Sequence, residues 1–183
     1  VGAVCGCFNG FMIGYLQIPA MLVTLCGLQL YTGCGLMITK GPAITGLPEA
    51  YSFLGNGMIL GVPVAFLIFI AAGVIVYFLL RSTIYGQHVR YMGTNSMASR
   101  YSGINNLAVT IKTYMVSGIL GSLAGLIMVS RYNSAKTDYG SSYTLLSLLI
   151  VVLGGTNPDG GKGSAIGVFL SVVVLQLVSS AFN

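Results

Sequence analysis

Charged residues divide the chain into long apolar segments. The uncharged runs cover residues 1–39, 50–80, 113–130, 139–158 and 163–183. Because an α-helix needs roughly 20 residues to cross the hydrocarbon core of a bilayer, each run suits one crossing or slightly more. Strands of a membrane barrel would alternate polar and apolar residues, and residues 64–80 and 145–153 show no such alternation. The pattern predicts an all-α fold, a polytopic transmembrane helical bundle.

Glycine spacing gives the first run a distinct helix face. Gly2, Gly6, Gly10 and Gly14 recur every fourth residue, so they lie on one side of a helix and form a groove that another helix can approach closely. We expect a tight turn over residues 15–18. A second helix is expected over 19–39, with proline in its first turn, where the missing N–H costs nothing.

The middle of the chain alternates loops and spans. Residues 40–57 are rich in Gly and Pro and predict an extramembrane loop with one short surface helix. Further spans are expected over 58–80 and 113–130. In the second of these, small residues form one face suited to helix packing: Ser117, Gly121 and Gly125.

The last third contains a helix too short to cross comfortably. Residues 143–153 end at Gly154 and Gly155, which favours a broken or re-entrant helix. Broken backbone at membrane depth is tolerated only where protein or a water-filled cavity surrounds it. The final helix is predicted over 163–182, with small residues on one side: Gly163, Gly167 and Ser171.

Composition excludes a soluble fold. Only 6% of the 183 residues are charged, against roughly 25% in an ordinary soluble domain. Eight basic and three acidic side chains cannot cover a globular surface, so lipid is the expected solvent. The net charge of +5 does not indicate nucleic acid as a partner, because the basic residues are dispersed and form no stripe.

Charge asymmetry orients the chain in the membrane. Residues 81–112 contain Arg81, Arg90, Arg100 and Lys112 and no acidic residue, so the positive-inside rule predicts that this segment is cytoplasmic. The loops at 40–57 and 131–141 carry net charges of 0 and +1 and are expected on the opposite side.

A short helix is predicted within this basic segment. Asn95 can cap a helix over 96–102, and Gly103 can take the left-handed conformation that ends it. Such a short helix is marginal alone and needs a partner surface. Met97 and Tyr101, four residues apart, can present an apolar edge to a soluble protein. The alternative is a helix on the membrane surface, held by anionic lipid through its basic neighbours.

The chain has few side chains that could carry out enzymatic chemistry. One histidine, His88, and three carboxylates are scattered over separate loops, so we expect neither a catalytic site nor a metal or cofactor site. The glycine-rich stretch 155–164 (GTNPDGGKGS) lacks the spacing of a phosphate-binding loop, and Gly163 follows its lysine where a hydroxyl is required. The four cysteines all lie in the first apolar run and are interpreted as small membrane-facing residues: Cys5, Cys7, Cys26 and Cys34.

Neutral polar residues occur at membrane depth, whereas ionisable ones do not. Proton-coupled carriers and voltage sensors need buried ionisable groups, so the energy for any transport is expected to enter from outside the spans. The neutral residues suit hydrogen bonds between helices or a hydrated path for a neutral polyol. The candidates for such a translocation path are Asn9, Thr24, Gln29 and Ser147.

Three motifs in order give the chain a family resemblance. Residues 83–104 (TIYGQHVRYMGTNSMASRYSGI) are similar to the coupling segment of the ribose, xylose and arabinose type of ABC-transporter permease, with matches at Gly86, Gly93, Asn95, Ala98, Ser102, Gly103 and Ile104. Gln87 and Ser99 depart from the usual arginine and alanine. Residues 19–25 (PAMLVTL) and 153–163 resemble two further motifs of the same family.

The resemblance implies a complete transport assembly. It would comprise a dimer of permeases, homomeric or heteromeric, ABC ATPase subunits docked on the cytoplasmic coupling segment 81–112, and an extracytoplasmic solute-binding protein that delivers a sugar-like solute. Residues 1–183 would form a single transmembrane permease domain in the cytoplasmic membrane of a bacterium. Its coupling residues would be Gly93, Asn95, Ala98, Ser102, Gly103 and Ile104. Because the chain starts without methionine inside an apolar run and family members are longer, we expect a fragment.

Two other functions remain open from the sequence. The same machinery can carry another cargo, such as branched-chain amino acids, nucleosides or a signalling furanose. A zwitterionic amino acid would need a charged or helix-terminus site for its carboxylate. A passive channel or a structural membrane subunit, working without ATP, is the alternative from another class.

Overall fold

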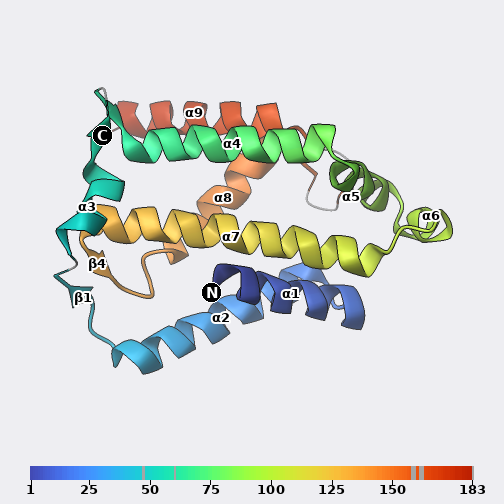
Figure 1. Ribbon diagram of the computed structural model, residues 1–183, viewed down its shortest axis with the longest axis horizontal. Coiled ribbons are helices and arrows are strands. Elements are labelled where there is room, and N and C mark those ends of the chain that lie inside the picture. The colour runs from blue at the N-terminus through green and yellow to red at the C-terminus, as the bar shows by residue number, and fades with distance from the viewer. Residues whose placement is uncertain (47, 60, 158–159, 161–162, 183) are drawn as a thin grey trace. The chain divides into compact units, whose positions relative to one another are not determined.

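Helices dominate the computed structural model (Figure 1), which describes residues 1–46, 48–59, 61–157, 160 and 163–182. The helices are α1 Gly2–Leu16, α2 Ala20–Thr39, α3 Glu49–Asn56, α4 Val64–Ser82, α5 Ile84–Thr94, α6 Ser96–Tyr101, α7 Asn106–Tyr132, α8 Ser141–Leu153 and α9 Ala165–Ala181. Four two-residue strands accompany them: β1 Ile44–Thr45, β2 Met58–Ile59, β3 Val62–Pro63 and β4 Ser134–Ala135. β1 pairs antiparallel with β4, and β2 with β3. The all-α prediction is confirmed.

Membrane-spanning helices are identified by length and hydropathy. Within the described residues, α2, α4 and α7 are long and apolar enough to cross a membrane, and α1, α8 and α9 are shorter apolar helices. None of the residues in the most apolar window of α4 is buried against the rest of the described chain. Such apolar surfaces are stable only against lipid or further protein, which confirms a helical membrane bundle.

Some predicted boundaries were wrong. The span expected over 58–80 begins at Val64, because the preceding residues form the β2–β3 hairpin. The span expected over 113–130 extends over Asn106–Tyr132, since Asn105 caps its first turn by accepting a hydrogen bond from the Ala108 amide. Helix α5 was not predicted, because its polar sequence has no long apolar run.

The described chain divides into two compact units. The first contains Val1–Val74 and Asn105–Tyr139, and the second contains Ile75–Ile104 and the described residues of Gly140–Asn183. Helix α4 begins in the first unit and ends in the second.

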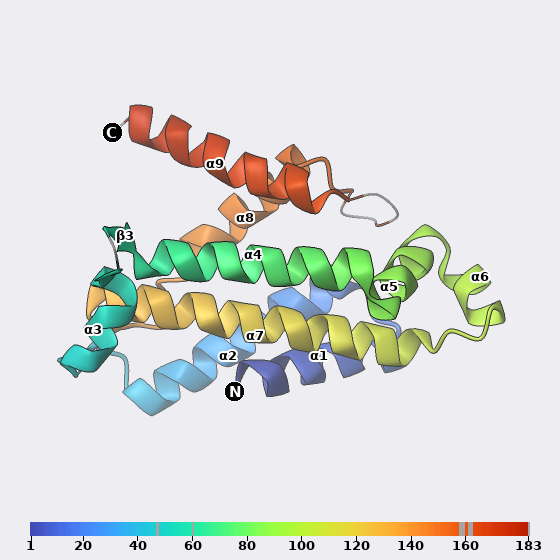
Figure 2. The same ribbon diagram turned by 45° about the horizontal axis from the view of Figure 1, so that its top comes forward.

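In the first unit, α1 lies antiparallel along α7 through its glycines, as Figure 2 shows. A Cβ built on Gly10 would lie only 2.8 Å from the Cα of Ile111, so the two backbones almost touch. The contacts repeat every fourth residue and pair Gly2 with Gly118 and Ser122, Gly6 with Tyr114 and Met115, Gly10 with Ile111, and Gly14 with Leu107. The groove predicted from the glycine spacing is confirmed.

The packing face of α7 differs from the predicted one. Gly118, not Gly121 or Gly125, lies against α1. A Cβ on Gly121 or Gly125 would meet no described atom within 4 Å, and Ser117 is exposed. The small-residue face over 117–125 is therefore not the α1 contact.

At the C-terminal end of α7, two distant loops join. Ser130 is almost fully buried, and its hydroxyl donates a hydrogen bond to the Tyr51 carbonyl of α3. The β1–β4 pairing then holds residues 44–45 against 134–135. The loops over 40–57 and 131–141 therefore lie on the same side of any membrane that α7 crosses, as their similar charges suggested.

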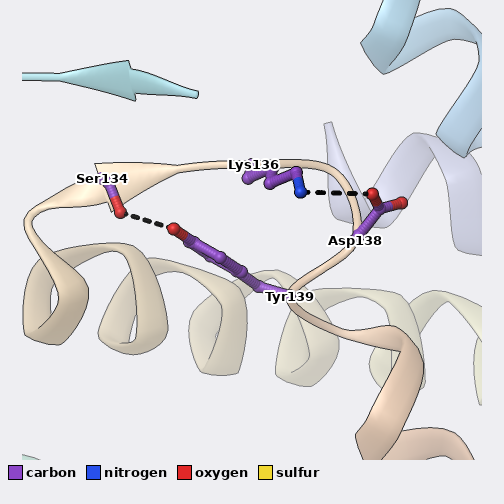
Figure 3. Close-up of polar contacts among 4 residues, drawn as sticks. All are labelled: Ser134, Lys136, Asp138 and Tyr139. Atoms are coloured by element: carbon purple, nitrogen blue, oxygen red, sulfur yellow. Dashed lines mark hydrogen bonds and ion pairs between the residues drawn. The ribbon is translucent and has the colours of Figure 1, made fainter. Parts of the chain in front are cut away.

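Local contacts shape the turn that follows β4 (Figure 3). The Ser134 hydroxyl lies 2.8 Å from the Tyr139 hydroxyl, within hydrogen-bonding distance, and the Lys136 ammonium lies 3.7 Å from an Asp138 carboxylate oxygen. The ion pair is about half exposed, so solvent screening makes its contribution to stability small.

Candidate functional site

The candidate site is the segment between the spans α4 and α7, and it begins with a tight turn. The Thr83 hydroxyl donates to the Leu79 carbonyl and accepts a hydrogen bond of 3.2 Å from the Gly86 amide, which caps α5. Gly86 is buried, and a Cβ there would collide with the Leu79 and Leu80 carbonyls at the end of α4. This turn explains why threonine and glycine occur three residues apart in the motif.

Asn95 joins α5 to α6 through three of its polar groups. Its amide donates to the Tyr91 carbonyl at 3.1 Å, and its carbonyl accepts from the Ser99 amide at 3.1 Å. Its side-chain Oδ1 accepts from the Met97 and Ala98 amides at 3.0 and 3.1 Å. The predicted N-cap is confirmed, and Asn95 also ends the preceding helix.

The C-terminal end of α6 is also held by hydrogen bonds. Gly103 has φ +80°, in the left-handed region, and its amide donates to the Arg100 carbonyl at 3.1 Å. The Ile104 amide donates to the Ser99 carbonyl at 3.1 Å. These two bonds form a Schellman motif, and the left-handed conformation predicted for Gly103 is confirmed. Ser102 donates through both its amide and its hydroxyl to the Ala98 carbonyl.

Helix α6 has one buried side chain and an exposed apolar edge. Ser99, where the family pattern has alanine, is 3% exposed and its hydroxyl donates to the Ser96 carbonyl. Met97 and Tyr101 are 63% and 88% exposed. Arg100 is exposed beside them. The result is a six-residue helix, capped at both ends, that exposes apolar and basic side chains.

The second glycine motif shapes the connection between α8 and α9. Gly155 has φ +76°, and the amides of Gly155 and Thr156 donate to the Val152 and Val151 carbonyls, which ends α8 with another Schellman motif. Gly154 is buried against α9, where a Cβ on it would lie 2.7 Å from the Val168 Cα. Gly167 faces Gly154, and Ser171, one turn further, is buried. The predicted short helix ending at the double glycine is confirmed as an element.

The candidate path residues lie on three helices, α1, α2 and α8. Asn9 and Tyr31 join α1 to α2, because the Tyr31 hydroxyl lies 3.1 Å from Asn9 Oδ1 and also donates to the Cys5 carbonyl at 3.2 Å. The hydroxyls of Thr24 and Ser147 bond the backbone of their own helices, to Ala20 and Thr144 respectively. Gln29 is exposed on α2. Of the two roles considered for these residues, Asn9 has the interhelical one.

Comparison with known proteins identifies the family. The whole chain, residues 1–183, matches the family model described as branched-chain amino acid transport system / permease component. The chain belongs to this permease family. The resemblance drawn from the three motifs is thereby confirmed.

Curated relatives of the permease are about one third identical to it over the aligned residues. Ribose import permease protein RbsC of Bacillus subtilis (strain 168) is 36% identical over 177 residues, which are 96% of this chain and 55% of the relative. RbsC of Haemophilus influenzae is 32% identical over 100% of this chain and 58% of the relative. Autoinducer 2 import system permease protein LsrD of Yersinia pseudotuberculosis is 32% identical over 96% of this chain and 54% of the relative. None of the solved structures matches the chain.

The permease is a multi-pass protein of the bacterial cytoplasmic membrane, as its family and its three long apolar helices show. It spans between half and three fifths of the length of these relatives.

Sequence reasoning found the termini of α6 but missed two features of the site. It did not predict α5, and it gave no structural role to Thr83 and Gly86 although both stand in the quoted motif. The signal for the turn was present, because threonine is a preferred N-cap residue and Thr83 follows soon after a long apolar run.

Proposed function

We propose that the chain is the membrane-spanning permease subunit of an ATP-driven ABC importer that carries a monosaccharide or sugar-like solute. The family and the named imports of the relatives, ribose and autoinducer 2, support this class of cargo. Its partners would be ABC ATPase subunits, an extracytoplasmic solute-binding protein and a second permease copy, in a homodimer or heterodimer. ATP hydrolysis would reside in the ATPase subunits.

One observation carries the proposal: α6 is held at both ends and exposes Met97 and Tyr101. A six-residue helix is marginal in isolation, yet its two caps hold it in one conformation. It is therefore suited to being pushed as a rigid body. We place the cytoplasmic coupling segment at 81–112 and its contact with the ATPase at 93–104.

In this mechanism, ATP binding closes the ATPase subunits and displaces the helix after Asn95. The displacement passes to α4 and α7, the spans that flank the segment in the chain, and they switch access from one side to the other. The ATPases can shift the two permease states only by contacting them differently, so the exposed edge of α6 must be bound more tightly in one state.

Charge placement supports an external source of energy. The charged residues of α2, α4 and α7 are Arg81, Lys112 and Arg131, which lie in the first two turns or the last turn of their helices. Ion-coupled carriers place ionisable groups inside the bundle. A neutral solute driven by ATP needs none.

The decisive experiment measures uptake by the full-length permease in liposomes with its ATPase and binding protein. Uptake that requires ATP and stops with ADP is expected. Uptake that persists without ATP would instead establish the passive-channel alternative. Binding and uptake of radiolabelled ribose, autoinducer 2, a nucleoside and leucine then separate the cargo classes, and preference for leucine would overturn the sugar assignment.

A further inference from the structure

The turn that follows α8 lies against the end of α5, within the second unit. A Cβ built on Gly160 would lie 3.2 Å from the Gly93 carbonyl oxygen and 3.7 Å from the Gly93 Cα. A side chain at position 160 would therefore press against the end of α5. This contact joins the two glycine motifs, residues 83–104 and 153–163, which the sequence analysis treated separately.

The two glycines differ in what their own elements require. Gly93 is the penultimate residue of α5, where glycine weakens a helix relative to alanine. Gly160 has φ +96°, and its amide donates to the Asn157 carbonyl at 3.0 Å, which closes a turn aimed at α5. The positive φ favours glycine at position 160, and the approach to Gly93 leaves little room for a larger side chain there.

The described residues around Gly160 are packed onto the helices on either side. Gly154, at the end of α8, touches α9 through Gly167 and Val168. A Cβ on Gly163 would lie 3.2 Å from the Thr156 Cγ2, so the chain leaving α8 and the chain entering α9 are also in contact. In the chain, Gly160 stands seven positions after the end of α8 and five before the start of α9, so we expect a displacement applied there to reach both helices.

We propose that the turn at Gly160 faces the cytoplasm and transmits the movement of the coupling segment directly to α8 and α9. This route is additional to the one through α4 and α7, and it rests on the proposed function. Because Gly93 belongs to the basic segment, its neighbour Gly160 is on the same side of the membrane. Helix α8 then begins on the extracytoplasmic side, where the 131–141 loop is expected, and ends on the cytoplasmic side. Helix α9 runs back towards the extracytoplasmic side.

The location is tested by labelling, without any transport. Asn157 is exposed in the same turn, so Asn157→Cys in a background with the four native cysteines changed to Ser provides the probe. A membrane-impermeant maleimide should label it only after the cells are permeabilised. Labelling in intact cells would overturn the cytoplasmic placement.

The mechanical role is tested with two substitutions that share backbone strain but differ in contact. Gly160→Leu inserts a side chain against Gly93, whereas Gly155→Leu, at φ +76°, would place its Cβ where no described atom lies within 4 Å. In the complete transporter, Gly160→Leu should lower uptake by about 2- to 30-fold while ATP hydrolysis continues. Gly155→Leu carries the backbone strain without the contact, so its loss of uptake should be smaller than that of Gly160→Leu. Equal effects of the two substitutions would overturn the role of the contact.

A disulfide distinguishes elements that move together from elements that must separate. The approach of Gly160 to Gly93 suits a disulfide between Gly93→Cys and Gly160→Cys in the same cysteine-free background. Elements that move as one should tolerate the bond, so the oxidised pair should transport at least as well as the reduced pair. Failure of the bond to form, or loss of uptake on oxidation, would overturn the proposal. ATP-independent uptake by the native protein would overturn only the proposed function, because labelling and cross-linking still report the contact.

Discussion

Asn95 is the residue on which the coupling segment depends most directly. Its side-chain Oδ1 accepts hydrogen bonds from the Met97 and Ala98 amides, and its backbone ends α5. We expect Asn95→Ala to destabilise the start of α6 by about 1 kcal/mol, because two amides lose their acceptor. Hydrogen exchange at these amides should become about fivefold faster.

Serine at the same position is the matched control. Asn95→Ser keeps an oxygen that can accept from the same amides and should restore slow exchange. If the alanine variant exchanged as slowly as the native protein, the cap would not be holding α6.

Gly103 tests whether the other end of α6 matters for coupling. At φ +80°, a β-branched residue such as Val is strained by about 1–2 kcal/mol, although a Cβ would meet no described atom within 4 Å. Gly103→Val should therefore uncouple the reaction, with uptake reduced by about 5- to 30-fold and ATP hydrolysis retained. Uptake and hydrolysis measured together in liposomes check this. Gly103→Asn tolerates the left-handed region and should transport almost normally; native uptake by the valine variant would refute the role of this helix end.

At the scale of elements, the α1–α7 contact is the clearest case of sequence-encoded packing. A side chain on Gly6 would collide with the Tyr114 carbonyl and lie 3.0 Å from the Met115 Cα. Gly6→Leu should therefore lower stability by about 1–3 kcal/mol, since two backbones must move apart. The measurement is the apparent Tm of the purified permease in detergent.

A leucine on a neighbouring helix is the control that separates the loss of close helix packing from the general effect of adding an apolar side chain. Gly33 lies on an exposed part of α2, and a Cβ there would meet no described atom within 4 Å. Gly33→Leu should leave the apparent Tm unchanged. A similar loss from both substitutions would show that leucine at any glycine is harmful and that the α1–α7 groove is not special.

At the scale of the whole molecule, the two ends of α7 must lie on opposite sides of the membrane. The basic segment precedes α7, and the joined loops over 40–57 and 131–141 lie at its other end. In the cysteine-free background, Lys136→Cys should react with an impermeant maleimide in intact cells. Asn95→Cys should react only after permeabilisation, and the reverse pattern would contradict both the orientation and the coupling mechanism.

The sequence alone determined the membrane class, the order of the apolar helices and the two caps of α6. Each depends on local chemistry: apolar length for a span, an amide acceptor at Asn95, and a residue free to adopt positive φ at Gly103. It also determined that one face of α1 can be approached closely, because four-residue spacing fixes a helix face regardless of the partner.

Only the tertiary structure decided which elements meet. Spacing could not show that α1 uses Gly118 of α7 rather than Gly121, that β1 pairs with β4, or that Gly160 touches Gly93. These contacts join residues far apart in the chain. They depend on how all the helices pack together, and a local sequence pattern does not determine that packing.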